Sequence, residues 1–171
     1  DKTMGAFGGA VYIYPRKADQ SGWDFGWQGH GASEPLLATD GSRQDLYGIA
    51  VGMSDSMWLA VAAPGFDTDP DGSQNDAGRV YLYRQVPARP PFIGADRWEV
   101  QQVITSASDF TDFGTRLVIS DKYLACTSLE NVNGVGQKSG AVYVYAFNAA
   151  TGQWDLDQVL RGRPLQASPD L

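Results

Sequence analysis

The stretch from Phe113 to Tyr145, FGTRLVISDKYLACTSLENVNGVGQKSGAVYVY, contains three short segments in which apolar and polar residues alternate. The first segment follows an aromatic-glycine pair, the second follows the turn residues Ser120-Asp121-Lys122, and the third opens at Gly140. Alternation over a few residues, with turn residues at both ends, is typical of half-buried strands. The stretch therefore predicts three consecutive strands joined by tight or polar connections.

The same order of features occurs earlier, at residues 47–83. Both stretches begin with an aromatic-glycine pair, turn at Ser-Asp and end in a Gly-x-Val-Tyr-x-Tyr strand. A third copy of that last strand starts at Gly9, and a fourth strand opens with a tryptophan at Trp98 and Trp154, and more weakly at Trp23. Repeats whose loops vary in length indicate tandem structural units, and four antiparallel strands form one blade of a β-propeller.

We therefore predict an all-β fold made of propeller blades, about two and a half of them in 171 residues. The expected strands lie near 9–14, 47–53, 57–63, 78–84, 98–104, 113–119, 122–128, 140–147 and 154–160. The expected units are a partial blade at 1–35, full repeats at about 36–105 and 106–160, and the start of another repeat at 161–171. Because a closed propeller needs about four blades or more, we expect further blades from a longer protein or from other chains.

The alternation also predicts which side chains are buried. We expect Val80, Leu82, Val142 and Val144 to face the interior between blades. The tyrosines beside them lie on the opposite face of the same sheets, and we expect them to be largely buried too, with their hydroxyls paired.

The order of these motifs resembles the FG-GAP repeat, over roughly residues 5–14 and 36–160. Ala62-Ala63-Pro64 stands where that family has Gly-Ala-Pro, and Thr127-Ser128-Leu129 is a more degenerate version. FG-GAP repeats build the propellers of integrin α subunits and of many surface proteins. The resemblance implies a non-catalytic interaction module, extracellular or at the cell surface, that binds a protein or carbohydrate ligand. The alternatives are a lectin-like propeller or the accessory propeller of an enzyme such as a surface hydrolase or phospholipase.

One loop carries a pattern suited to metal binding. Three aspartates alternate along the loop and a glycine follows the third, so that a short loop can wrap carboxylate oxygens around one hard cation. The predicted calcium ligands are Asp67, Asp69, Asp71, Ser73, Asn75 and Asp76. An ordinary acidic surface loop is the alternative interpretation.

Integrin-type propellers carry a similar acidic loop, but usually between the first two strands of a blade, whereas here it follows the second strand. The equivalent loop of the next repeat, at 130–136, has few carboxylates. It is either a metal-free turn or a weak site through Glu130, Asn131 and Asn133.

Composition excludes several functions. A net charge of −7 argues against nucleic-acid binding, which needs a basic surface. No window approaches the ~20 consecutive apolar residues of a membrane helix, so we expect no membrane insertion in this segment.

Cys126 is the single cysteine and His30 the single histidine, and we find no catalytic constellation. The segment at 15–35, with Trp23, Trp27 and His30, is either an irregular outer strand with a loop or a binding loop.

Overall fold

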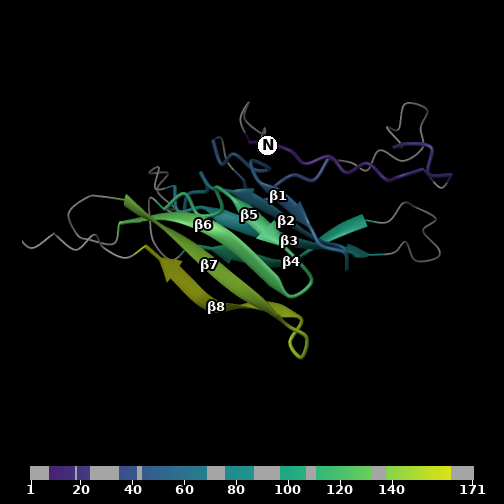
Figure 1. Ribbon diagram of the computed structural model, residues 1–171. Helices are drawn as coiled ribbons and strands as arrows, with labels where there is room; N and C mark the ends of the chain where they lie inside the picture. The colour runs from purple at the N-terminus through teal and green to yellow at the C-terminus, as the bar shows by residue number, and fades with distance from the viewer. Residues whose placement is uncertain are drawn as a thin grey trace, which may run out of the picture.

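The protein folds into two four-stranded antiparallel sheets (Figure 1). Sheet 1 has the order β1-β2-β3-β4, and sheet 2 has the order β5-β6-β7-β8. The strands of sheet 1 are β1 (Val51–Met53), β2 (Trp58–Ala63), β3 (Arg79–Val86) and β4 (Arg97–Thr105). The strands of sheet 2 are β5 (Leu117–Ile119), β6 (Tyr123–Asn131), β7 (Lys138–Asn148) and β8 (Gln153–Arg161).

This computed structural model describes residues 8–17, 19–23, 35–41, 44–68, 76–86, 97–106, 111–131 and 138–162. These residues contain strands and turns but no helix, so the prediction of an all-β fold with four-stranded units is confirmed. Within the same residues, no helix is long and apolar enough to span a membrane.

The first strand of each sheet is shorter than the alternation predicted. Gly48 and Gly114 have φ angles of +89° and +96°, in the left-handed region that favours glycine. Each glycine N–H still donates to the neighbouring strand, Gly48 to the Ala62 carbonyl and Gly114 to the Thr127 carbonyl, both at 2.8 Å. The aromatic-glycine pairs are therefore hydrogen-bonded turns that lead into β1 and β5.

The predicted strand at 9–14 is wrong. Gly9 has a φ of +79°, which breaks the extended conformation, and Val11 forms only an isolated bridge with Leu36. Trp23 does not begin a fourth strand either, because it forms a single bridge with Arg16 and remains 55% exposed. Trp27 and His30 lie outside the described residues.

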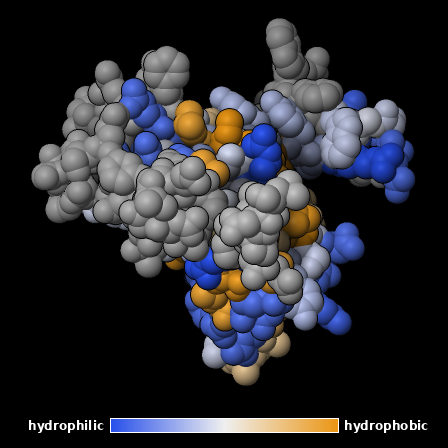
Figure 2. Space-filling model, turned by 60° about the vertical axis from the view of Figure 1, so that its left-hand side comes forward, coloured by the Kyte–Doolittle hydropathy of each residue, from blue (hydrophilic) through white to orange (hydrophobic). Residues whose placement is uncertain are grey.

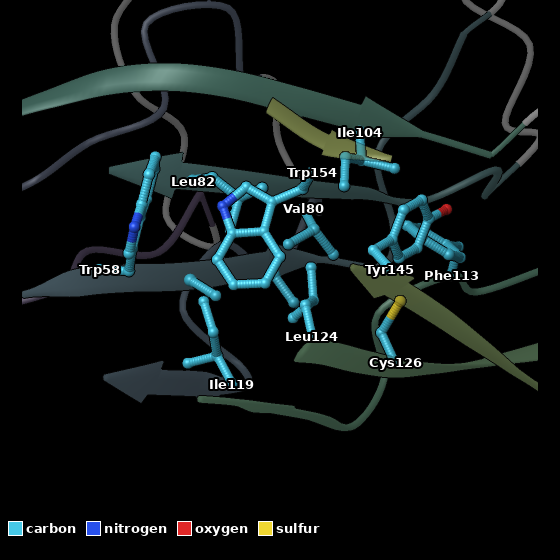
Figure 3. Close-up of a cluster of buried hydrophobic side chains, with 12 residues drawn as sticks. Trp58, Val80, Leu82, Ile104, Phe113, Ile119, Leu124, Cys126, Tyr145 and Trp154 are labelled. Atoms are coloured by element: carbon cyan, nitrogen blue, oxygen red, sulfur yellow. The ribbon is translucent and has the colours of Figure 1, made fainter. Parts of the chain in front are cut away.

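The two sheets pack face to face through a core of aromatic, aliphatic and small side chains (Figure 3). Trp154 lies in the middle of this inter-sheet core, and its ring meets Trp58 edge-on at 5.6 Å between centroids and an angle of 87°. Sheet 1 contributes Trp58, Ala60, Ala62, Val80, Leu82 and Ile104. Sheet 2 and the turn before it contribute Phe113, Ile119, Leu124, Cys126, Tyr145 and Trp154. Burial raises the pKa of the Cys126 thiol to about 12, so that it stays protonated.

The alternation along β3 is confirmed. Val80 and Leu82 lie in the inter-sheet core, whereas Tyr81 and Tyr83 are buried in a second cluster on the other face of sheet 1. Val11, Ile13 and Leu36 pack against that second cluster, so the segments before β1 cover this face.

The alternation along β7 places the tyrosines, not the valines, toward sheet 1. Tyr143 and Tyr145 contact the inter-sheet core, and Val142 and Val144 therefore point to the opposite face of sheet 2. Both valines are half-buried because, among the described residues, no second sheet packs on that side. The same register thus gives full burial in sheet 1 and partial burial in sheet 2.

Replacing Gly78 by alanine tests this packing. Gly78 has a φ of +86°, and an added Cβ would lie 2.4 Å from both the backbone N and the backbone O of Phe113. Strain of this kind costs roughly 1–3 kcal/mol, and the clash adds to it. We expect Gly78→Ala to lower the free energy of unfolding in urea by at least that amount.

Gly140, the equivalent glycine of sheet 2, provides the control, because nothing lies within 4 Å of a Cβ added there. Gly140→Ala should change the free energy of unfolding little. Equal effects of the two substitutions would contradict the described contact between Gly78 and Phe113.

Candidate functional site

The acidic loop between β2 and β3 begins in a hydrogen-bonded turn, and two further hydrogen bonds close its base. The Phe66 N–H donates to the Ala63 carbonyl at 3.2 Å, and the Gly78 N–H donates to the Phe66 carbonyl at 3.0 Å. The Asp76 N–H then donates to Oδ1 of Asp67 at 3.0 Å. The chain therefore leaves and rejoins the sheet at adjacent points, with Asp67 and Asp76 at the base of the loop.

Of the six predicted calcium ligands, the structure brings together Asp67 and Asp76. Asp69, Asp71, Ser73 and Asn75 lie outside the described residues. Within the described part of the chain, no group of three or more His, Cys, Asp or Glu side chains is placed to hold a metal ion. The calcium site consequently remains a prediction.

The second candidate metal loop begins later than predicted. Glu130 and Asn131 belong to β6, where they pair with Ser139 and Lys138 of β7. The strands of this hairpin run further than the alternation suggested, because backbone pairing continues beyond the apolar residues. Asn133 lies outside the described residues.

The base of the acidic loop is joined to the link between the sheets. The Asp76 carbonyl accepts hydrogen bonds from the N–H groups of Thr111 and Asp112, at 3.1 and 3.0 Å. The Thr111 hydroxyl donates to the Ala77 carbonyl at 2.7 Å, and the Ser128 hydroxyl donates to the Thr111 carbonyl at 3.2 Å. We call this edge, made of residues 64–68, 76–78 and 111–114, the loop edge. A change in the acidic loop would therefore reach both sheets.

Arg79 ties the segment before β1 to sheet 1. Its guanidinium forms a salt bridge with Asp40, donates through Nε to the Thr105 hydroxyl at 2.9 Å, and lies 3.5 Å from the centroid of the Phe66 ring. The Tyr81 hydroxyl donates to Asp40 at 2.7 Å. The sequence analysis missed this group, although one signal was available: position 79 is charged in this repeat but is an alanine, Ala141, in the next.

Buried tyrosines on the same side of sheet 1 are held in their neutral form. The Tyr47 and Tyr83 hydroxyls are 2.6 Å apart, and burial raises the pKa of both phenols above its ordinary value. Burial and the hydrogen bond to Asp40 raise the pKa of Tyr81 in the same direction. Neutral, mutually hydrogen-bonded phenols stabilise a core and are poor proton-transfer groups near neutral pH.

A further hollow lies between the two Ser-Asp turns. It measures about 420 Å³ and is lined by residues 53–55 and 119–123. The Ser56 N–H donates to the Asp121 carboxylate at 2.8 Å across the two sheets, and this bond lowers the pKa of Asp121. The carboxylate thus fixes one turn against the other.

A comparison with protein families matches residues 32–83 to the FG-GAP repeat. The match includes β1, β2, most of β3 and the whole acidic loop. It supports the family that the motifs resemble. A comparison with curated proteins gives no match.

The tyrosine pair predicts how stability depends on alkaline pH. Because the pKa values of Tyr47 and Tyr83 are raised in the folded protein, the neutral phenols contribute fully below the ordinary tyrosine pKa of about 10, and this contribution is lost as the pH rises above it. We expect the urea midpoint to fall above about pH 10. The urea midpoint of the double variant Tyr47→Phe/Tyr83→Phe should fall less steeply with pH. The midpoint of Tyr123→Phe, which changes a side chain that is 53% exposed, should behave like that of the parent. Parallel curves for all three proteins would contradict the raised pKa values.

Proposed function

Because residues 32–83 form an FG-GAP repeat, we propose that the chain is a calcium-binding propeller module that recognises a protein or carbohydrate ligand without catalysing a reaction. FG-GAP repeats are typical of extracellular and surface proteins, so we place its action outside the cell or at the cell surface. Other blades of the same propeller are its structural partners.

The arrangement of the sheets supports the propeller assignment. Each sheet has four antiparallel strands in sequential order, and sheet 2 packs on one face of sheet 1 through the inter-sheet core. Stacking of such sheets around an axis is the architecture of a propeller, whose loops gather at its ends. Loops on a rigid scaffold are the usual place for ligand recognition.

The closed base of the acidic loop carries the calcium proposal. Asp67 already points an oxygen at the Asp76 N–H across the base, so Asp67 and Asp76 start and end the loop from fixed positions. Between them the sequence supplies Asp69 and Asp71, and calcium prefers six to eight such oxygen ligands at flexible distances. When bound, the ion would neutralise carboxylates that otherwise repel one another.

The chemistry of the described core supports a non-catalytic role. The phenols of Tyr47 and Tyr83 and the thiol of Cys126 all have raised pKa values caused first by burial. Groups held neutral in this way stabilise packing and do not act as nucleophiles near neutral pH. The half-buried carboxylates of Asp67 and Asp76 at the loop edge are better suited to binding a cation.

Calcium-dependent stability tests the proposal. Binding to the folded form alone would add about 2.7 kcal/mol when free calcium exceeds the dissociation constant a hundredfold. We expect the melting temperature of the parent to be higher in calcium than in chelator, and Asp71→Asn to lose most of this difference.

Asp67→Asn separates ligation from loop closure. An asparagine keeps an oxygen that can accept the Asp76 N–H, but it lacks the charge. Its stability in chelator should match that of the parent, while its calcium-dependent shift should shrink. Asp157→Asn, a substitution at an exposed carboxylate on β8, should keep the full shift. A parent whose melting temperature is the same in calcium and in chelator would contradict the calcium site.

A further inference from the structure

The side-chain amide of Gln102 joins the two sheets. Its Nε2 donates to the carbonyl of Trp154 at 2.9 Å, and its Oε1 accepts the Trp154 N–H at 2.7 Å. Trp154 lies on β8, the outer strand of sheet 2, so its backbone groups are satisfied across the inter-sheet core. Two hydrogen bonds from one amide to one residue fix the position of β8 along β4, because a shift by one residue would break both.

The surface of sheet 1 against which β5 and the preceding aromatic-glycine pair lie is made of Gly52, Ala60, Ala62 and Val80, and we call it the seat. A Cβ added at Gly114 would lie 3.0 Å from the Ala62 Cβ and 3.1 Å from Val80 Cγ2, so its backbone rests directly on these side chains. Gly52 similarly lies against Leu117, whose Cδ1 would be 3.0 Å from an added Cβ. The seat and Gln102 together position sheet 2.

The outer face of sheet 2, which carries Val118, Ala125, Thr127, Val142, Val144, Gln158 and Leu160, repeats this arrangement. Gln102 lies opposite Leu82 and Gln158 lies opposite Val144, and in both sheets the register shifts by one residue immediately beside that pair. A β-bulge changes the direction of nearby side chains. Because both sheets have the bulge beside the glutamine, Gln102 and Gln158 occupy equivalent positions in their sheets.

The seat is repeated as well. A hollow of about 190 Å³ on sheet 2 is lined by Val118, Ala125, Thr127, Val142 and their neighbours. Ala125, Thr127 and Val142 occupy the repeat positions of Ala60, Ala62 and Val80.

The outer face is open to solvent where its counterpart is buried. Leu160 is 51% exposed, whereas its counterpart Ile104 is 8% exposed, and Val118 is 65% exposed. Figure 2 shows some hydrophobic residues among mostly hydrophilic ones in the lower part of the molecule. Apolar surface of this kind marks an interaction site.

We propose that Gln158 fixes the register of the next four-stranded sheet of the propeller on the outer face of sheet 2, by pairing with the backbone of that sheet's tryptophan position. The hollow receives the glycine of the partner's aromatic-glycine pair. This inference rests on the propeller part of the proposed function and not on calcium. Since Val118 replaces the Gly52 of sheet 1, the partner carries a side chain smaller than leucine at the position of Leu117.

A second copy of this chain does not supply that sheet. A partner sheet would dock through the face that carries its aromatic residues, as sheet 2 does on sheet 1. In a second copy, this face of sheet 1 is already covered, because Tyr81 and Tyr83 are only 2% and 3% exposed beneath Val11, Ile13 and Leu36. The aromatic face of sheet 2 is in the inter-sheet core. The occupant is therefore a separate sheet of the repeat.

An extended chain tests the proposal. A second copy of residues 106–171 is joined directly after Arg161, which ends β8 as Thr105 ends β4. Val118→Gly in the first copy introduces the glycine that sheet 1 has at the equivalent position, Gly52. Leu160→Cys in the first copy places a thiol on the outer face of sheet 2, and its labelling reports whether that face is exposed. Cys126 stays silent because it is buried and protonated. The rate of thiol labelling is measured in chelator, so that a failed calcium site does not affect the result.

We expect labelling to be slower in the extended chain than in the unextended chain with the same substitutions. In the extended chain, Gln158→Ala should raise the labelling rate roughly tenfold, the effect of losing two ordinary hydrogen bonds. Gln153→Ala on the same strand should leave the labelling rate unchanged. Equal labelling of both chains would overturn the docking surface. Slow labelling that ignores Gln158→Ala would overturn the role of Gln158. Protection of the unextended chain that increases with its concentration would assign the face to a second copy.

Discussion

The fit of large aromatic side chains on sheet 2 against small residues on sheet 1 holds the structure together. Trp154 and Phe113 fill the inter-sheet core beside the small side chains of Ala60 and Ala62, and Gly52 lies against Leu117 and Ile119 of β5. Burial of aromatic surface gives most of the stabilisation, and the edge-to-face contact between Trp58 and Trp154 adds to it. Gln102 then sets the register between the two sheets, because apolar packing alone discriminates only weakly against a shift of one sheet along the other.

The same constraint connects the core to the loop edge. Gly78 lies against the Phe113 backbone, and the neighbouring Asp76 carbonyl accepts two N–H groups of the link between the sheets. Asp76 also closes the acidic loop through Asp67. A cation bound in that loop would therefore stabilise the joint between two blades as well as one hairpin, which gives a physical reason for a metal site in this place.

Sequence patterns predicted the strands of both sheets because alternation is a local signal. They failed at 9–14, where Gly9 adopts a left-handed conformation and only a bridge to Leu36 forms, since the presence of a neighbouring strand is not encoded locally. They also missed the roles of Gln102 and Arg79, which depend on residues 52 and 39 positions away. The repeated glutamine at 158 was visible, but its meaning required the geometry of the first interface. The acidic loop was recognisable from composition, and the structure adds its closed base.

Hydrogen exchange at the Trp154 backbone amide tests the packing of the two sheets most directly. Trp154 lies on an outer strand, and its N–H donates to the Gln102 side chain from the other sheet. If the sheets pack as described, this amide exchanges slowly in the parent, and in Gln102→Ala it exchanges at a rate close to that of an exposed amide while the amides of β6 and β7 stay protected. Rapid exchange at Trp154 in the parent, or slow exchange that Gln102→Ala does not change, would contradict the packing on which the account depends.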